Sequence, residues 1–158
     1  MSVTVTPATP QDVPTILSLI RELAEYEKLL DRVTATEDLL RRTLFGSRPY
    51  AEVLVARLDG RAIGYALFFH SYSTFLARPG IYLEDVYVQP AFRGRGVGKA
   101  LLRDVAQVAR ERDCGRMEWS VLDWNKPSID FYLSLGAKPL DDWTTYRLDE
   151  RAIADLAK

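Results

Sequence analysis

The residues with the clearest chemical potential lie in one stretch, "YLEDVYVQPAFRGRGVGK", from Tyr82 to Lys99. It begins as an apolar strand that carries two adjacent carboxylates, Glu84 and Asp85, and it ends in a loop of arginine and glycine. A carboxylate among apolar residues is costly to bury unless it is paired, hydrogen-bonded or protonated, so this placement favours a functional role. Pairing of both acids with arginines or helix N-termini is the structural alternative.

Strand alternation predicts opposite faces for the two acids. One face would hold Glu84 with Tyr82, Val86 and Val88, and the other would hold Asp85 with Ile81, Leu83 and Tyr87. Each face then has one acid among apolar residues, which is typical of a central strand covered on both sides.

The loop "RGRGVGK", from Arg93 to Lys99, directly precedes a predicted helix. Closely spaced glycines allow backbone N–H groups to turn inward, and a helix N-terminus adds partial positive charge, so the loop predicts an anion site, most simply for phosphate. A Walker A loop would need Gly in place of Arg93 and Ser or Thr in place of Ala100. A dinucleotide fingerprint would need Gly or Ala at Lys99 or Leu101. The pattern that remains is Arg-x-x-Gly-x-Gly between a strand and a helix.

The elements that must position these residues follow from hydrophobic periodicity and from turn and cap signals. The Asp59-Gly60 dipeptide predicts a tight hairpin, and Thr34 with Glu37 has the spacing of a capping box. We expect strands over 2–6, 51–58, 62–72, 81–88, 117–122 and 144–149, and helices over 9–29, 34–45, 98–112 and 125–136. This order predicts an α/β fold with a mixed sheet and helices packed on its faces.

Composition limits the alternatives. The 158 residues, 47% of them hydrophobic, are expected to form a single domain over 1–158, and the net charge of −1 argues against a generally basic nucleic-acid binder. Cys114 and His70 are the only residues of their types, so we expect no disulfide and no metal site, and we interpret His70 as structural. No window approaches the roughly 18 apolar residues of a membrane span. We therefore expect no membrane association and a cytoplasmic location.

Five stretches, taken together, resemble the GNAT N-acetyltransferase superfamily. They are "RELAEYEKL", "YLEDVYV", "RGRGVGK", "VLDWNKPSIDFY" and "LGA", and they stand in the order and approximate spacing of its diamine acetyltransferase group, which includes spermidine/spermine and thialysine acetyltransferases. The resemblance runs from Val5 to Leu148. It implies a mixed, largely antiparallel central sheet with a splayed central strand and helices on both faces, acetyl-CoA as co-substrate, and a homodimer.

The resemblance also implies roles for the residues that match the family's cofactor contacts. The backbone of Val86, Tyr87 and Val88 would bind the pantetheine arm, and the amides of Gly94, Arg95, Gly96, Val97, Gly98 and Lys99 would bind the pyrophosphate. Arg93 and Arg95 could add side-chain charge, and Asn125, Lys126, Pro127 and Ser128 would make further contacts. Tyr132 would protonate the departing thiolate, which its phenol can do at neutral pH. A solvated Arg95 and a Tyr132 that merely packs on its helix are the structural alternatives.

On the acceptor side, Glu84 matches an acid near the attacking amine, as a general base or as an electrostatic anchor. Tyr26, Glu27, Asp85, Glu118, Trp119 and Ser120 match positions on the substrate side. The implied reaction is acetyl transfer to a primary amine of a small cationic acceptor, a polyamine, diamine or thialysine-like amino acid, in a ternary complex. "AEYEKL" and "VLDWN" lie closer to the thialysine branch. A non-catalytic acyl-CoA-binding module and an acetyltransferase for protein or peptide amines are the alternatives.

Overall fold

The sheet is built around the hairpin that the Asp59-Gly60 dipeptide predicts. In the computed structural model, which describes residues 2–158, strands β2 (Glu52–Leu58) and β3 (Arg61–Ser73) are antiparallel and meet at this dipeptide. Asp59 and Gly60 both have positive φ, 51° and 80°. A two-residue turn of this kind matches the twist of the flanking strands, so local sequence chemistry sets the start of the β2–β3 hairpin.

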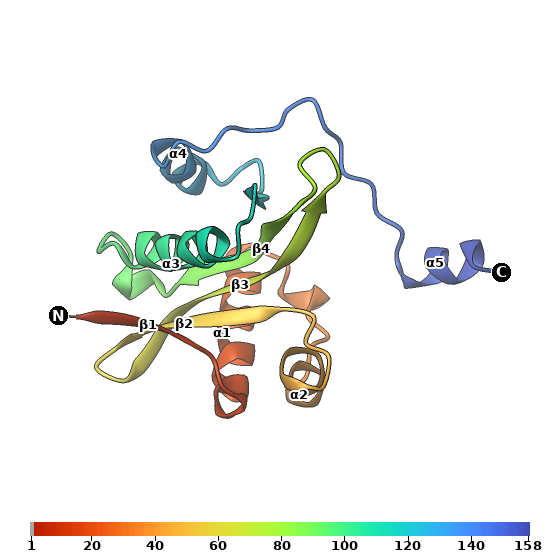
Figure 1. Cartoon of the computed structure of the whole chain (residues 1–158). Coiled ribbons are helices and arrows are strands. Elements are labelled where there is room, and N and C mark those ends of the chain that lie inside the picture. Colours follow the sequence, from red (N-terminus) through yellow and green to blue (C-terminus); the bar gives the residue numbers. More distant parts are fainter. Residues whose placement is uncertain (1) are drawn as a thin grey trace. The chain divides into compact units, whose positions relative to one another are not determined.

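The five strands form one sheet in the order β1-β2-β3-β4-β5 (Figure 1). Strand β1 (Val3–Pro7), β2, β3 and β4 (Arg78–Val88) pair antiparallel, and β5 (Met117–Trp119) pairs parallel to β4. The predicted mixed and largely antiparallel sheet is therefore confirmed.

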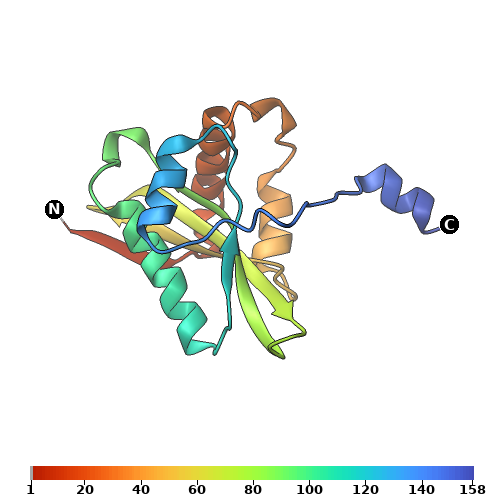
Figure 2. The same ribbon diagram turned by 90° about the horizontal axis from the view of Figure 1, so that it is seen from above.

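Helices cover both faces of this sheet, as predicted (Figures 1 and 2). Helix α1 (Val13–Tyr26), which follows a short 3-10 turn, and α2 (Glu37–Phe45) lie on one face, and α3 (Val97–Glu111) lies on the other. Thr36 caps α2 by accepting a hydrogen bond from the Leu39 amide at 3.1 Å. The predicted capping box at Thr34 is wrong, because the chain becomes helical only at Glu37 and the adjacent Thr36 takes the N-cap position.

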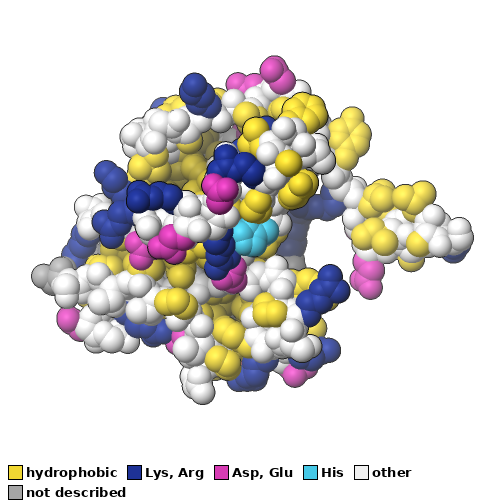
Figure 3. Space-filling view, in the orientation of Figure 1, with side chains coloured by type: hydrophobic (Ala, Val, Ile, Leu, Met, Phe, Trp, Pro, Cys, Tyr) yellow, Lys and Arg dark blue, Asp and Glu magenta, His cyan; other side chains and the backbone are white. Residues whose placement is uncertain are grey.

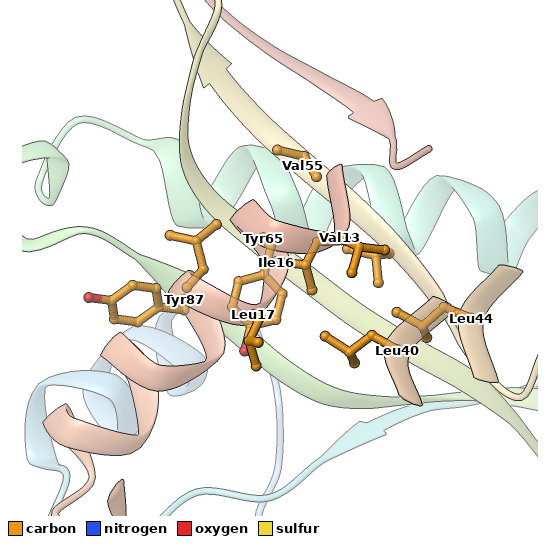
Figure 4. Close-up of a cluster of buried hydrophobic side chains, with 10 residues drawn as sticks. Val13, Ile16, Leu17, Leu40, Leu44, Val55, Tyr65 and Tyr87 are labelled. Atoms are coloured by element: carbon orange, nitrogen blue, oxygen red, sulfur yellow. The ribbon is translucent and has the colours of Figure 1, made fainter. Parts of the chain in front are cut away.

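The main hydrophobic core fills the space between α1, α2 and the sheet (Figure 4). Its aromatic members, Tyr65 on β3 and Tyr87 on β4, lie at paired positions with ring centroids 6.5 Å apart. The other buried members are Val13, Ile16, Leu17, Leu19, Leu40, Leu44, Val53 and Val55. Two phenols thus enter an otherwise aliphatic core, and each hydroxyl needs a hydrogen-bond partner.

The chain divides into two compact units, one up to Ser120 and one from Val121 onward. The second unit contains helix α4 (Lys126–Ser134), with Asn125 at its N-cap and Gly136 at φ 88° after its end, and helix α5 (Glu150–Leu156). The prediction of a last strand over 144–149 is wrong. This segment is irregular, and Trp143 and Tyr146 are 80% and 90% exposed. It pairs with no strand in the part of the chain that is described. Helix α5, capped by Asp149, was not predicted.

Basic and acidic side chains are interspersed on the face shown in Figure 3. Arg112 illustrates the pattern: its guanidinium makes two hydrogen bonds to Glu52, at 2.6 and 2.8 Å, and a third to Nε2 of His70 at 3.0 Å. Because a guanidinium only donates, Nε2 accepts, and Nδ1 carries the proton donated to the Gly80 carbonyl at 3.0 Å. His70 therefore ties β3 to β4 and α3, in line with a structural role. Residues 2–158 contain no helix with the length and apolar character needed to cross a membrane.

Candidate active site

Strand β4 loses its partner on one side halfway along its length. Its parallel pairing with β5 covers only Ile81 to Leu83, whereas its antiparallel pairing with β3 continues to Val88. From Glu84 onward, the edge of β4 that faces away from β3 has no strand partner among the described residues. This is the splayed strand that the family resemblance predicts, and its backbone is open to hydrogen bonding by a bound molecule.

Glu84 is the extra residue of a β-bulge. In the pairing of β3 with β4, Leu67 lies opposite Asp85 and Phe68 lies opposite Leu83, so no residue of β3 is paired with Glu84. The prediction that Glu84 shares a buried face with Tyr82 and Val86 is therefore wrong. The bulge interrupts the two-residue period and leaves Glu84 exposed, next to the buried Leu83. An exposed carboxylate beside the open edge of β4 can meet a solvated cation.

Unlike the exposed Glu84, Asp85 lies on the side of the sheet that faces α1. The hydroxyl of the fully buried Tyr65 donates a hydrogen bond to Asp85 Oδ2 at 2.9 Å. Burial raises the pKa of Asp85 to about 6, an effect that the Tyr65 hydrogen bond opposes and that the nearby Glu84 and Glu27 reinforce. Asp85 is thus a carboxyl group that titrates at a pH close to neutral.

Glu27, at the C-terminal end of α1, is the third acid of this region. It is half-buried, and both burial and the charge of Glu84 raise the pKa of its carboxyl. We refer to Glu27, Glu84 and Asp85 as the acid cluster, because the charge of Glu84 raises the pKa of both other acids and that of Glu27 raises the pKa of Asp85. A cation placed among like charges relieves their repulsion, so the acid cluster is suited to an ammonium group.

Arg93, the first residue of the glycine loop, contacts both substrate-side and cofactor-side elements. Its Nε donates to the Val88 carbonyl at 2.8 Å. Its guanidinium lies over the ring of Tyr26, 4.7 Å from the centroid, and over the ring of Tyr87, 5.5 Å from the centroid. The structure therefore uses the side chain predicted to stabilise pyrophosphate charge to fasten the loop to β4 and to the end of α1.

The loop itself has the backbone geometry of an anion site. Gly94 and Gly96 have φ of 74° and 80°, and a Cβ at either position would meet nothing within 4 Å. Glycine is needed here for the positive φ rather than for space. Gly96 is the N-cap of α3 and offers no capping side chain, so the first amides of the helix, at Val97, Gly98 and Lys99, are available to an anion. These amides suit a phosphate-type anion.

Two further residues of the loop have cationic side chains. Lys99 is exposed, and the exposed Arg95 lies with its guanidinium 5.9 Å from the ring centroid of Phe92. Both can approach a phosphate by rotation of flexible side chains.

Glu118, Trp119 and Ser120 lie at the parallel pairing of β5 with β4. Glu118 is paired with Tyr82 and Trp119 with Leu83, and both are half-buried. The Ser120 hydroxyl is 2.7 Å from the Tyr82 hydroxyl. These predicted substrate-side residues therefore lie along the strand where the sheet begins to splay.

The remaining predicted residues belong to the second unit and gather on α4. The buried Asn125 accepts a hydrogen bond from the Ser128 amide at 3.4 Å, Pro127 stands in the first turn, and Lys126 is paired with Asp130 at 3.1 Å. Tyr132 is half-buried, with its ring 5.8 Å from that of Phe131. Asn125 to Ser128 and Tyr132 thus share one short helix and its cap.

Sequence reasoning missed three residues that support this site: Tyr65, Glu22 and Gln89. Glu22 on α1 accepts hydrogen bonds from the Tyr87 hydroxyl at 3.1 Å and from Gln89 Nε2 at 3.2 and 3.3 Å. Burial and the Glu22 carboxylate raise the pKa of Tyr87 to about 12, so this phenol stays a donor. No local motif marks these residues; only the pairing of β3 with β4 and the position of α1 bring them to the site.

Comparison with known proteins shows the family to which the chain belongs. The sequence model of the acetyltransferase (GNAT) family matches residues 16–137. The chain belongs to the GNAT acetyltransferase family. It is an N-acetyltransferase, and the family uses acetyl-CoA. The described residues contain no group of three or more His, Cys, Asp and Glu side chains that could hold a metal ion.

Similar proteins support this assignment over most of the chain. Thialysine N-epsilon-acetyltransferase of Bos taurus is 43% identical over an alignment that covers 92% of each chain. L-ornithine N5-acetyltransferase NATA1 of Arabidopsis thaliana is 33% identical over an alignment that covers 96% of this chain and 86% of that protein. Among solved structures, an integron cassette protein from the mobile metagenome of V. cholerae superimposes with a TM-score of 0.84 at 25% identity, covering 100% of this chain and 99% of that one.

Proposed function

We propose that this N-acetyltransferase transfers the acetyl group of acetyl-CoA to a primary amine of a small cationic acceptor, of the thialysine, ornithine or diamine type. The observation that carries the proposal is the acid cluster of Glu27, Glu84 and Asp85 beside the open edge of β4. Similar proteins that act on thialysine and on ornithine support the same class of acceptor.

The acid cluster has two tasks in this proposal. Aliphatic amines are protonated at neutral pH, so the cluster first attracts the ammonium group and then a carboxylate accepts its proton, directly or through a water molecule. Glu84 is exposed and can reach the solvated amine, whereas Asp85 is held by Tyr65. We assign the contact with the reacting nitrogen to Glu84, and charge neutralisation to Asp85 and Glu27.

Acetyl-CoA supplies an acetyl group activated as a thioester. In the proposal, the amides of the Gly94–Lys99 loop hold its pyrophosphate, and the open backbone of Val86 to Val88 holds the pantetheine arm. An N–H group on the same edge donates to the acetyl oxygen as negative charge develops there. Tyr132 gives its phenolic proton to the departing sulfur, and the second proton that the nitrogen loses as the amide forms restores the phenol. The amine attacks the thioester directly while both substrates are bound, so no covalent acetyl-enzyme is required.

The finer specificity follows from the number of carboxylates. A single ammonium group neutralises one carboxylate, whereas the acid cluster has three, so an acceptor with a second positive charge should bind better. Tyr26, Glu118, Trp119 and Ser120 would line the path of the rest of the acceptor. A single domain over 1–158, a homodimer and a cytoplasmic location complete the proposal.

The test is release of free CoA thiol from acetyl-CoA with a panel of amines. We expect turnover with thialysine, ornithine and diamines, and a clearly higher kcat/KM for 1,5-diaminopentane than for pentylamine, which differs by one amino group. Equal kcat/KM for this pair, or thiol release with a peptide amine alone, would contradict the proposed acceptor class.

A further inference from the structure

Among residues 2–158, Tyr65 is the one buried tyrosine whose hydroxyl contacts an acid of the proposed acceptor site. Its side chain is fully buried and packs in the core beneath α1, beside Ile16 and Leu17 (Figure 4). Its hydroxyl donates to Asp85 Oδ2 at 2.9 Å. A hydroxyl placed this deep is oriented by its surroundings and has little freedom to choose another partner.

The sheet register explains why these two residues meet. Tyr65 is paired with Tyr87, and the next inward-facing pair is Leu67 with Asp85, so Asp85 is the diagonal neighbour of Tyr65 on the same face. Glu84, the bulge residue, comes immediately before Asp85 in β4. Tyr65 therefore fixes Asp85 at the point where β4 changes from a regular strand to the splayed segment.

The groups around Asp85 are acidic or phenolic. Glu84 lies beside it on β4, Glu27 approaches from the end of α1, and Tyr65 faces it from β3; both glutamates raise the pKa of Asp85, and the Tyr65 hydrogen bond lowers it. Tyr87, the other phenol of this layer, is committed to Glu22. Burial, and next the charge of Asp85, raise the pKa of Tyr65 well above its ordinary value, so Tyr65 remains a donor.

We propose that Tyr65 is a positioning residue for acetyl transfer, which acts by holding Asp85 in place and in its ionised form so that the acid cluster can receive a cationic amine. This inference rests on the proposed acceptor function and deepens it. Without the phenol, the carboxyl would be equally buried and would face the same two glutamates, but it would lose the donor that favours its charge.

The test is Tyr65→Phe, which removes one oxygen and keeps the ring in the core. A hydrogen bond to a charged acceptor is worth at least about one pKa unit, so the midpoint for Asp85 should rise from about 6 to about 7. At pH 6 the ionised fraction of Asp85 would fall about fivefold, and kcat/KM for the amine should fall by a similar factor and recover above about pH 8.5. The KM for acetyl-CoA should change little.

Carbon-13 NMR of the Asp85 carboxyl in the acceptor-free protein measures the midpoint without activity, with the signal assigned by its absence in Asp85→Asn. Tyr87→Phe is the matched control, because it removes a buried phenol of the same layer that bonds to Glu22, and it should leave the Asp85 midpoint unchanged. In the Asp85→Asn background, Tyr65→Phe should no longer shift the acidic side of the pH dependence of kcat/KM.

An unchanged Asp85 midpoint in folded Tyr65→Phe would overturn the inference, and so would a loss of kcat/KM that is equal at every pH. A wild-type protein that acetylates no amine, with the midpoint still raised in the variant, would instead overturn the proposed function and leave the contact intact. The two failures are therefore distinguishable.

Discussion

Asp85→Asn should make the protein more stable at neutral pH while impairing the proposed reaction. The substitution removes the charge but keeps an oxygen that can accept the Tyr65 hydrogen bond. The pKa of Asp85 is raised from 3.8 to about 6 in the folded protein. The folded state therefore favours the neutral acid, and the wild type loses stability as pH rises from about 4 through about 6. A shift of roughly two pKa units corresponds to about 3 kcal/mol at pH 8.

The free energy of unfolding, from urea denaturation at pH 4 to 8, measures this effect. The difference between Asp85→Asn and the wild type should be small at pH 4 and should reach about 3 kcal/mol in favour of the variant at pH 8, or about 6–12 °C in Tm. Asp59→Asn is the matched control, since it makes the same chemical change in an exposed turn and should alter stability by less than about 0.5 kcal/mol. A variant that is less stable at pH 8, or a difference that does not depend on pH, would refute the reasoning.

Three further substitutions test separate parts of the site. Tyr132→Phe should lower kcat by about 10²-fold with the KM for acetyl-CoA nearly unchanged, and an unchanged kcat with chemistry rate-limiting would remove Tyr132 from the mechanism. Glu84→Gln should lower kcat/KM for the amine most at low pH, and progressively less as pH rises and free amine becomes available. A decrease in kcat/KM that is constant across the pH–rate profile would identify Glu84 as an anchor rather than a base. Gly96→Ala should destabilise the fold by about 1–2 kcal/mol and weaken acetyl-CoA binding in calorimetry, because alanine resists a φ of 80°; unimpaired binding would exclude this loop geometry from cofactor recognition.

Features set by neighbouring residues could be predicted from the sequence. The Asp59-Gly60 turn, the Asn125 cap and the start of α3 next to Gly96 each depend on a few residues whose backbone preferences agree with the final structure. The glycine loop was predicted for the same reason, because its positive φ values require glycine at Gly94 and Gly96.

Features set by pairing between distant segments could not be predicted. The bulge at Glu84 exists only in the register of β4 against β3, and it reverses the predicted burial of this acid. The contact between Tyr65 and Asp85 joins residues 20 positions apart and follows from the same register. Alternation over 144–149 predicted a strand, but a strand also needs an edge to pair with, which periodicity does not supply.

The most direct test of the proposed function is product analysis after incubation with acetyl-CoA and thialysine. Mass spectrometry should show one added acetyl group, located on the side-chain nitrogen, with one equivalent of CoA thiol released. The rate should fall sharply when both Glu84 and Asp85 are replaced by their amides. Absence of acetylated product with thialysine, ornithine and diamines alike, in a protein that binds acetyl-CoA, would contradict the proposed acceptor class.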